Sequence, residues 1–163
     1  MACLYLLEPE VAGELGRNTV FETGDNARDK GKRPVVTKLH YHFSGWLGDD
    51  LLEATPCFIV TASLARKIEE SNLSGCIFDD VEISLSDEFV ELYPGKVLPA
   101  FKQMIPRGEV TVDNNYAFRD WSGHDFCITE QAYLIVSEKV LNLLQNHKIE
   151  NCDITELAVG RGS

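Results

Sequence analysis

Two segments of the chain share one order of apolar and polar positions. Residues 58–60 form an apolar run that ends at Thr61, and apolar residues then recur at helical spacing. Residues 134–136 repeat this order 76 positions later, with Ser137 in place of Thr61. Threonine and serine are favoured helix N-caps, so each segment predicts a strand that runs into a short amphipathic helix. The apolar helix positions are Leu64, Ala65 and Ile68 in the first segment and Val140, Leu141 and Leu144 in the second.

The rest of the chain shows mainly the alternation that is typical of strands. Strands are predicted at residues 3–7, 34–43, 76–78, 81–85 and 109–112, and within 149–159. A turn is expected at 113–115. Residues 13–34 are polar and rich in turn formers, which predicts a long mobile loop. Three prolines, at positions 94, 99 and 106, divide residues 87–106 into short pieces, so the pattern assigns no element there.

Both tryptophans of the chain lie in the pattern W-x-G-x-D. One copy is Trp46-Leu-Gly-Asp-Asp50, and Trp121-Ser-Gly-His-Asp125 follows 75 positions later. Any strand, N-cap and helix in succession would produce similar apolar matches between the two segments. The tryptophan motif that is repeated upstream of both favours instead an internal duplication, with copies at about 46–85 and 121–159. We therefore expect a single α+β domain over residues 1–163, made of two related strand-helix-strand halves on a shared, mostly antiparallel sheet. Structural roles are expected for Trp46, Gly48, Asp50, Trp121, Gly123 and Asp125.

The charge of the chain is strongly acidic. Fifteen basic and 26 acidic residues give a formal net charge of −11. Nucleic acids and anionic membranes are therefore poor partners, because their binding depends on lysine and arginine. A basic protein would be attracted instead. Solubility alone is the alternative explanation of such acidity.

The acidic residues gather in one part of the sequence. Between Glu69 and Glu91 the chain contains no lysine or arginine. A sheet face or edge with this lining would suit a basic protein surface, or would form a solvated edge that resists aggregation. The partner-binding residues predicted here are Asp79, Asp80, Glu82, Asp87, Glu88 and Glu91.

Other residues are candidates for metal binding or catalysis, with less support from the sequence. His40 and His42 have the spacing of metal ligands on one strand face, and Asp49, Asp50, His124 and Asp125 are possible further ligands. Two histidines on an alternating strand are more often only its solvent face, so we expect no metal and no cofactor. A hydrolase-like enzyme with Asp50, His124 and Asp125 in a pseudo-symmetric cleft is the alternative function. Cys127 close to His124 is a further nucleophile candidate, in an apolar context that disfavours it.

The N-terminal sequence and the cysteines bear on the compartment. Residues 1–8 lack a basic n-region and lose their apolar character at Glu8, which argues against a signal peptide. No stretch has the length of apolar sequence that a membrane span requires. The five cysteines are widely spaced and odd in number, which favours reduced thiols. These features predict a cytoplasmic protein.

The succession of motifs resembles small immunity proteins of bacterial polymorphic-toxin systems. The resemblance covers about residues 46–157. It is based on the two W-x-G-x-D motifs and on Pro56-Cys-Phe-Ile-Val-Thr61, Leu73-Ser-Gly75, Asp80-Val-Glu-Ile-Ser84, Leu98-Pro-x-Phe101, Gly123-x-Asp-Phe126 and Leu134-Ile-Val-Ser-Glu138. It implies a cytosolic, non-enzymatic protein that binds and neutralises one cognate toxin domain, here a basic one such as a nuclease. A plain interaction domain of a larger complex is a third possibility.

Overall fold

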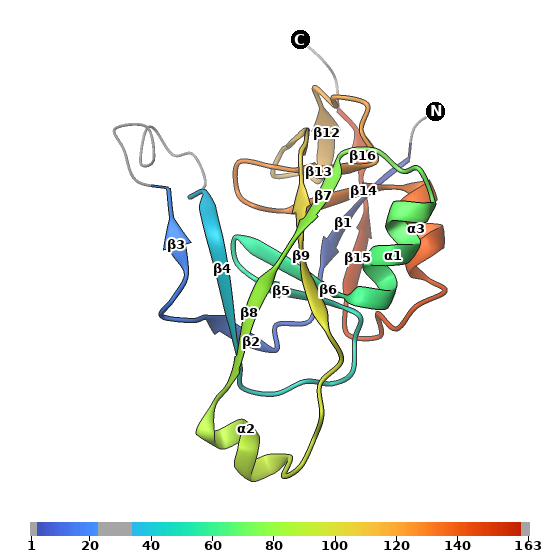
Figure 1. Cartoon of the computed structure of the whole chain (residues 1–163). Helices are drawn as coiled ribbons and strands as arrows, with labels where there is room; N and C mark the ends of the chain where they lie inside the picture. Colours follow the sequence, from blue (N-terminus) through green and yellow to red (C-terminus); the bar gives the residue numbers. More distant parts are fainter. Residues whose placement is uncertain (1–2, 23–33, 161–163) are drawn as a thin grey trace.

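The computed structural model describes residues 3–22 and 34–160, which form a small α+β fold with mixed sheets and few helices (Figure 1). The helices in this part of the chain are α1 (Ala62–Glu70), α2 (Asp87–Leu92) and α3 (Glu138–Leu144). Thr61 and Ser137 are the N-caps of α1 and α3, and each side chain accepts a hydrogen bond from the backbone N–H three residues later. Both predicted strand-to-helix passages are therefore confirmed.

Two of the sheets contain these passages. One has the strand order β5 (Leu51–Ala54), β6 (Cys57–Thr61), β9 (Phe101–Pro106) and β7 (Cys76–Asp79). The other has the order β10 (Gly108–Glu109), β13 (Phe126–Ile128), β14 (Leu134–Ser137), β1 (Leu4–Glu8) and β15 (Asp153–Glu156). Apart from the parallel pair β10 and β13, all neighbours in these two sheets are antiparallel.

The two remaining sheets flank this pair. In one, β2 (Gly13–Leu15) and β3 (Val20–Phe21) pair antiparallel with successive parts of β4 (Val36–Phe43), and β8 (Val81–Leu85) pairs with β4 in parallel. The other is small and joins β11 (Thr111–Val112), β12 (Ala117–Arg119) and β16 (Ala158–Val159). Strands β7 and β8 follow each other as one ribbon that leaves the β9 sheet and joins β4, and α2 continues from its lower end (Figure 1).

Strands from distant parts of the chain occupy matching places in the first two sheets. β9 lies between β6 and β7, and β1 lies between β14 and β15, all antiparallel. The cap Thr61 is opposite Phe101 in one sheet, and the cap Ser137 is opposite Leu4 in the other. The expectation of one shared sheet is wrong, because each strand-helix-strand segment pairs with its own central strand in a separate sheet.

The helices instead share a core. Leu64 and Ile68 of α1 and Val140 and Leu144 of α3 belong to one buried cluster, together with side chains of β6, β9, β14 and β1. The apolar faces of the two short helices are therefore buried in one cluster to which both sheets contribute. A second cluster, around Tyr41 and Phe43, joins β4 to β5, β6 and α2, and a third lies under β11 and β12.

Two regions differ from the sequence expectations. The predicted loop 13–34 contains β2 and β3, which pair with β4, while residues 23–33 lie outside the described part of the chain. A side chain at Gly13 would collide with the backbone of His42, so glycine there permits the close approach of β2. The unassigned segment 87–106 forms α2 and β9. Within residues 3–22 and 34–160, every helix is too short or too polar to cross a membrane.

Candidate partner-binding surface

The two W-x-G-x-D segments form turns with the same internal hydrogen bond. The indole N–H of Trp46 donates to the backbone oxygen of Asp49 at 3.0 Å, and that of Trp121 donates to the backbone oxygen of His124 at 2.9 Å. Gly48 and Gly123 have φ angles of +106° and +92°, a region that side chains disfavour. Tryptophan and glycine therefore shape these turns.

The aspartate that ends each motif connects its turn to both helices. Asp50 accepts a hydrogen bond from the hydroxyl of Thr61, the N-cap of α1, at 3.0 Å, and one from the backbone N–H of Lys148, beyond α3, at 2.9 Å. Asp125 accepts one from the hydroxyl of Ser137, the N-cap of α3, at 2.8 Å. It also accepts one from the backbone N–H of Ser74, beyond α1, at 3.0 Å. Each aspartate thus holds the start of one helix and the segment after the other.

Hydrogen bonds also determine the charge state of Asp125. Burial raises the pKa of this carboxyl, but hydrogen bonds from Ser74 and Ser137 outweigh that effect, so its pKa lies below the ordinary value. Asp125 lines a small pocket with Trp121 and Ser137 that includes neither Asp50 nor His124. Of the residues of the alternative enzyme, Asp50 is therefore engaged at one turn, and His124 and Asp125 belong to the other.

The thiol of the candidate nucleophile Cys127 contacts the backbone of the turn that contains His124. This thiol donates to the backbone oxygen of His124 at 3.4 Å, and burial raises its pKa. Burial likewise raises the pKa of Cys57 to about 12. Thiols with raised pKa values are weak nucleophiles at neutral pH because little thiolate is present.

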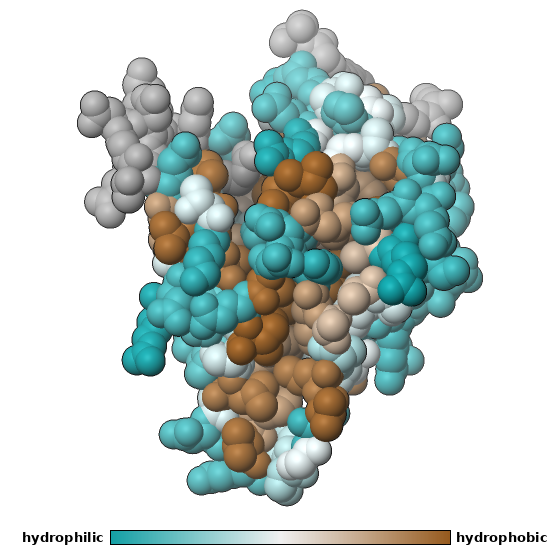
Figure 2. Space-filling view, in the orientation of Figure 1, coloured by the Kyte–Doolittle hydropathy of each residue, from teal (hydrophilic) through white to brown (hydrophobic). Residues whose placement is uncertain are grey.

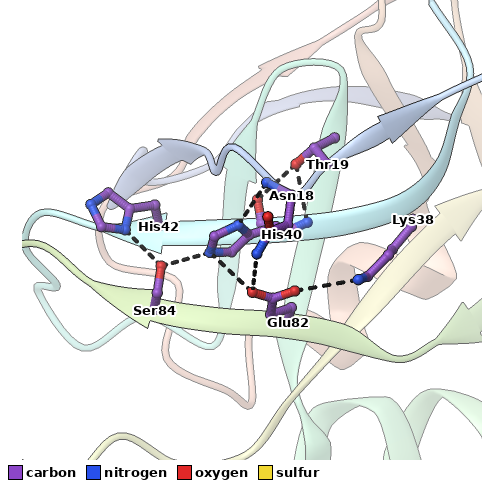
Figure 3. A network of polar contacts seen from close by, with 7 residues as sticks. All are labelled: Asn18, Thr19, Lys38, His40, His42, Glu82 and Ser84. Atoms are coloured by element: carbon purple, nitrogen blue, oxygen red, sulfur yellow. Dashed lines mark hydrogen bonds and ion pairs between the residues drawn. The ribbon is translucent and has the colours of Figure 1, made fainter.

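His40 and His42 belong to a polar network between β4 and β8 (Figure 3). His40 is buried, and its Nε2 lies 2.6 Å from the hydroxyl of Ser84, which is also 2.6 Å from Nδ1 of His42. The backbone N–H of Asn18 donates to Nδ1 of His40, so the neutral ring carries its proton on Nε2 and donates to Ser84. The hydroxyl of Ser84 can then donate to His42, which links the two strands.

This network does not extend to the other candidate metal ligands. Asp49 is buried and accepts hydrogen bonds from the backbone and the side chain of Asn151. No group of three or more histidine, cysteine, aspartate or glutamate side chains in the described ranges has an arrangement that could hold a metal ion. His40 is closed over by Gly16, where a side chain would collide with the imidazole ring. The placement of His40 on a solvent-exposed face is therefore wrong.

Three of the six predicted partner-binding acids lie along β7 and β8 and have internal partners. Asp80 forms an ion pair with Lys102 at 2.7 Å, and the hydrogen bond from that lysine lowers the pKa of Asp80. Glu82 accepts a hydrogen bond from Asn18 at 2.9 Å, which lowers its pKa, and lies 3.4 Å from Lys38. Asp79 accepts from the backbone N–H of Asp80. The negative charge of this group is partly compensated within the protein.

The other three acids lie on α2, at the far end of the ribbon. Strand β8 spans roughly 17 Å at 3.3 Å per residue, with Asp79 and Asp80 before its start, Glu82 near its start and the acids of α2 beyond its end. The six acids are therefore spread along this length. Exposed aliphatic side chains accompany the acids of α2, and Figure 2 shows hydrophobic atoms over this end of the molecule. We call this set the α2 surface: Leu85, Asp87, Glu88, Val90, Glu91, Leu92 and Val97.

One buried side chain fixes the orientation of the α2 surface. Phe89 is 1% exposed, and its ring packs against Phe43 at 6.3 Å and Tyr93 at 5.2 Å between centroids. Ser86 caps the helix by accepting from the N–H of Phe89. Because Phe89 points inward, its neighbours Glu88 and Val90 remain exposed. Val97 is 88% exposed, an unusual degree for a large aliphatic residue in a short surface segment.

The sequence reasoning missed the aliphatic part of this surface. The alternation of acidic and aliphatic residues in Asp87-Glu-Phe-Val-Glu-Leu92 was a signal of a short helix with one buried aromatic residue, but the nearby prolines obscured it.

No known protein-family model matches this chain, and no curated protein matches it either.

Proposed function

We propose that this chain is an immunity-type inhibitor that binds a basic toxin domain through the α2 surface. The observation that carries the proposal is the combination of exposed aliphatic residues with unpaired carboxylates on α2. Val90, Leu92 and Val97 are each more than half exposed, and Asp87, Glu88 and Glu91 have no ion pair within 4 Å in the described part of the chain. An apolar centre with a charged rim is the usual composition of a protein interface.

We further propose that the chain consists of two copies of one unit, at about residues 46–85 and 121–159. The matching tryptophan turns, the reciprocal bonds of Asp50 and Asp125, and the matching strand orders support this duplication. On this proposal the repeated motif serves the scaffold, whereas α2 and β9 separate the copies. The α2 surface then has no counterpart in the second copy, which is consistent with a dedicated binding role.

Growth rescue tests the function directly. The C-terminal domain of the protein encoded next to this chain's gene would be expressed in a bacterial host, with and without this chain. We expect the domain to arrest growth and co-expression to restore it. If the neighbouring domain is harmless, or if growth arrest persists with the folded chain present, the inhibitor function is wrong.

Charge reversal then tests the surface. In D87K/E88K/E91K, we expect affinity for the toxin domain to fall more than tenfold and association to slow most at low salt, because steering charges act mainly on the association rate. The matched control E70K/E130K/E150K changes the net charge equally at exposed positions outside the α2 surface. Equal losses in both variants would show a general charge effect and would remove the assignment to α2.

A further inference from the structure

An acidic pocket lies on a different part of the molecule from the α2 surface. Its volume is about 550 Å³, and its wall comes from the segment after β1, the turn before β5, β5 itself, the loop between β13 and β14, and the start of β15. Four carboxyl side chains line it: Glu8, Glu10, Glu53 and Asp153. No lysine, arginine or histidine is among the described residues that form its wall.

Glu10 has a buried carboxylate oxygen without a hydrogen-bond donor. The side chain is only 7% exposed, and its Oε2 accepts from the backbone N–H of Leu47 at 2.7 Å. Its Oε1 is buried and has no hydrogen-bond partner in the described part of the chain. A buried polar atom without a partner is costly, and within a carboxylate the cost is greater. A donor from a ligand would remove this cost.

The carboxylates near Glu10 make the binding of a cation in this pocket more favourable. Burial raises the pKa of Glu10, the backbone N–H groups of Leu47 and Asp49 act against this rise, and the charge of Asp49 adds to it. Burial also raises the pKa of Glu53, as does the charge of Glu8. Like charges held together in a partly buried site favour proton uptake or cation binding. At neutral pH a bound cation would stabilise the ionised forms.

The pocket rim is apolar. Val11 is 68% exposed, Leu47 is 64% exposed and Tyr133 is 44% exposed, and all three belong to the pocket wall. An apolar rim around carboxylates suits a ligand with an aliphatic stem and a positively charged end, as in lysine and arginine. A bare metal ion fits less well, because the carboxylates of the described residues form no group of three that could hold one.

We infer that this acidic pocket receives a lysine or arginine side chain of a protein that binds this chain. The inference depends on the proposed function only in that the bound molecule is a protein. The turn Trp46–Asp50 presents the N–H of Leu47 to Glu10, so a scaffold turn also fixes one wall of the pocket. The buried Glu10 and the half-buried Glu53 are the acceptors, and the rim contacts the aliphatic stem.

The first test needs no partner. The full chain, ¹⁵N-labelled, is titrated at pH 7 and low salt with N-acetyl-arginine amide, and in parallel with the uncharged N-acetyl-citrulline amide. We expect saturable amide shifts at Leu47, Glu53 and Tyr133 with the arginine compound only. An equal response to citrulline, or shifts spread over the whole acidic surface, would overturn the inference.

Variants then assign the acceptors. In E10Q and in E53Q we expect the affinity for the arginine compound to fall about tenfold, the size of one lost charge-assisted hydrogen bond. The control E70Q, on exposed α1, should bind as the wild type does. If E10Q proves poorly folded by circular dichroism, the double variant E53Q/D153N makes the same test at less buried positions. Wild-type affinity in E53Q/D153N would overturn the inference.

A last measurement distinguishes this inference from the proposed function. E53Q/D153N is assayed for growth rescue and for affinity to the toxin domain. A weakened complex supports the pocket as part of the interface. Full affinity for the toxin domain overturns the pocket inference while leaving the inhibitor function intact. Selective arginine binding together with a failed wild-type rescue assay supports the pocket and removes the inhibitor function.

Discussion

Asp125 holds Ser74, a residue 51 positions earlier in the chain, through hydrogen bonds from its backbone N–H and its hydroxyl. Asp50 holds Lys148, 98 positions later, in the same manner through the backbone N–H. The two contacts cross between the helix-containing segments, so neither segment has a complete set of turn contacts without the other. The contacts thus join the segments that carry α1 and α3, whose apolar side chains belong to one buried cluster.

The crossing contacts predict equal energetic roles for the two aspartates. We expect D50A and D125A each to lower the free energy of unfolding by about 1–3 kcal/mol, because each leaves a helix cap and a distant N–H without their acceptor. Urea unfolding measures this, with E130A as an exposed control that should change stability little. A large effect of one aspartate and none of the other would contradict the proposed duplication.

Coupling between each aspartate and its helix cap gives a second prediction. In S137A we expect a loss of about 1 kcal/mol, the usual value for an N-cap. The double variant S137A/D125A should lose less than the sum of the single variants, because both remove the 2.8 Å hydrogen bond. The same should be observed for T61A and D50A. Additive losses would show that the hydroxyl and the carboxylate act independently.

The lowered pKa of Asp125 makes its contribution depend on pH. Since its folded pKa lies below the unfolded value, its stabilisation is present above the unfolded pKa of about 3.9 and is lost as the pH falls through the folded pKa. The difference in unfolding free energy between wild type and D125A should therefore be constant from pH 7 to 5 and shrink below about pH 4. Urea titrations at several pH values measure it, and a difference unchanged at pH 3 would contradict the ionic role.

The anchor of the α2 surface can be tested without altering a charge. We expect F89A to free α2 from the core, with faster amide hydrogen exchange over residues 87–92 and weaker toxin binding. Loss of a buried phenylalanine costs about 3–5 kcal/mol, so F89L is the milder companion that retains most of the packing. If a variant whose α2 amides exchange fully still binds the toxin domain normally, α2 is not part of the interface.

The acidic pocket should bind cations more weakly at low pH. The pKa values of Glu10 and Glu53 are raised, so both carboxyls take up protons at a higher pH than ordinary glutamates do. The guanidinium remains charged throughout, so affinity for N-acetyl-arginine amide should fall as the pH decreases through these raised values. Titrations between pH 7.5 and 4.5 measure the effect. Constant affinity over this range would show that other groups bind the cation.

Local patterns were sufficient for several elements of the fold. The apolar runs before Thr61 and Ser137 and the helical spacing after them predicted β6, α1, β14 and α3, because caps and amphipathic faces depend on nearby residues. The same reasoning missed α2, β2 and β3. Prolines obscured the first, and β2 and β3 are too short for an alternating pattern, since they exist through pairing with β4.

The candidate sites, like the fold, were predicted only where they depend on residues close together in the chain. The sequence identified the acids of α2 but placed them with Asp80 and Glu82, whose partners Lys102 and Lys38 come from other strands. It gave no indication of the acidic pocket, because Glu10, Glu53 and Asp153 are far apart along the chain. The net negative charge follows from composition. Where the acidic residues gather, and which of them pair with basic residues, depends on which strands become neighbours.

By itself, the sequence determined the repeated order of tryptophan turn, strand, cap and helix, and the overall negative charge. These depend on interactions among residues close in the chain and on simple counting. Only the tertiary structure decided that the segments lie in separate sheets, that Asp50 and Asp125 cross between them, and that Glu10 is buried in a pocket. The reason is physical: strand partners and buried charges are fixed by long-range packing, which no local pattern records.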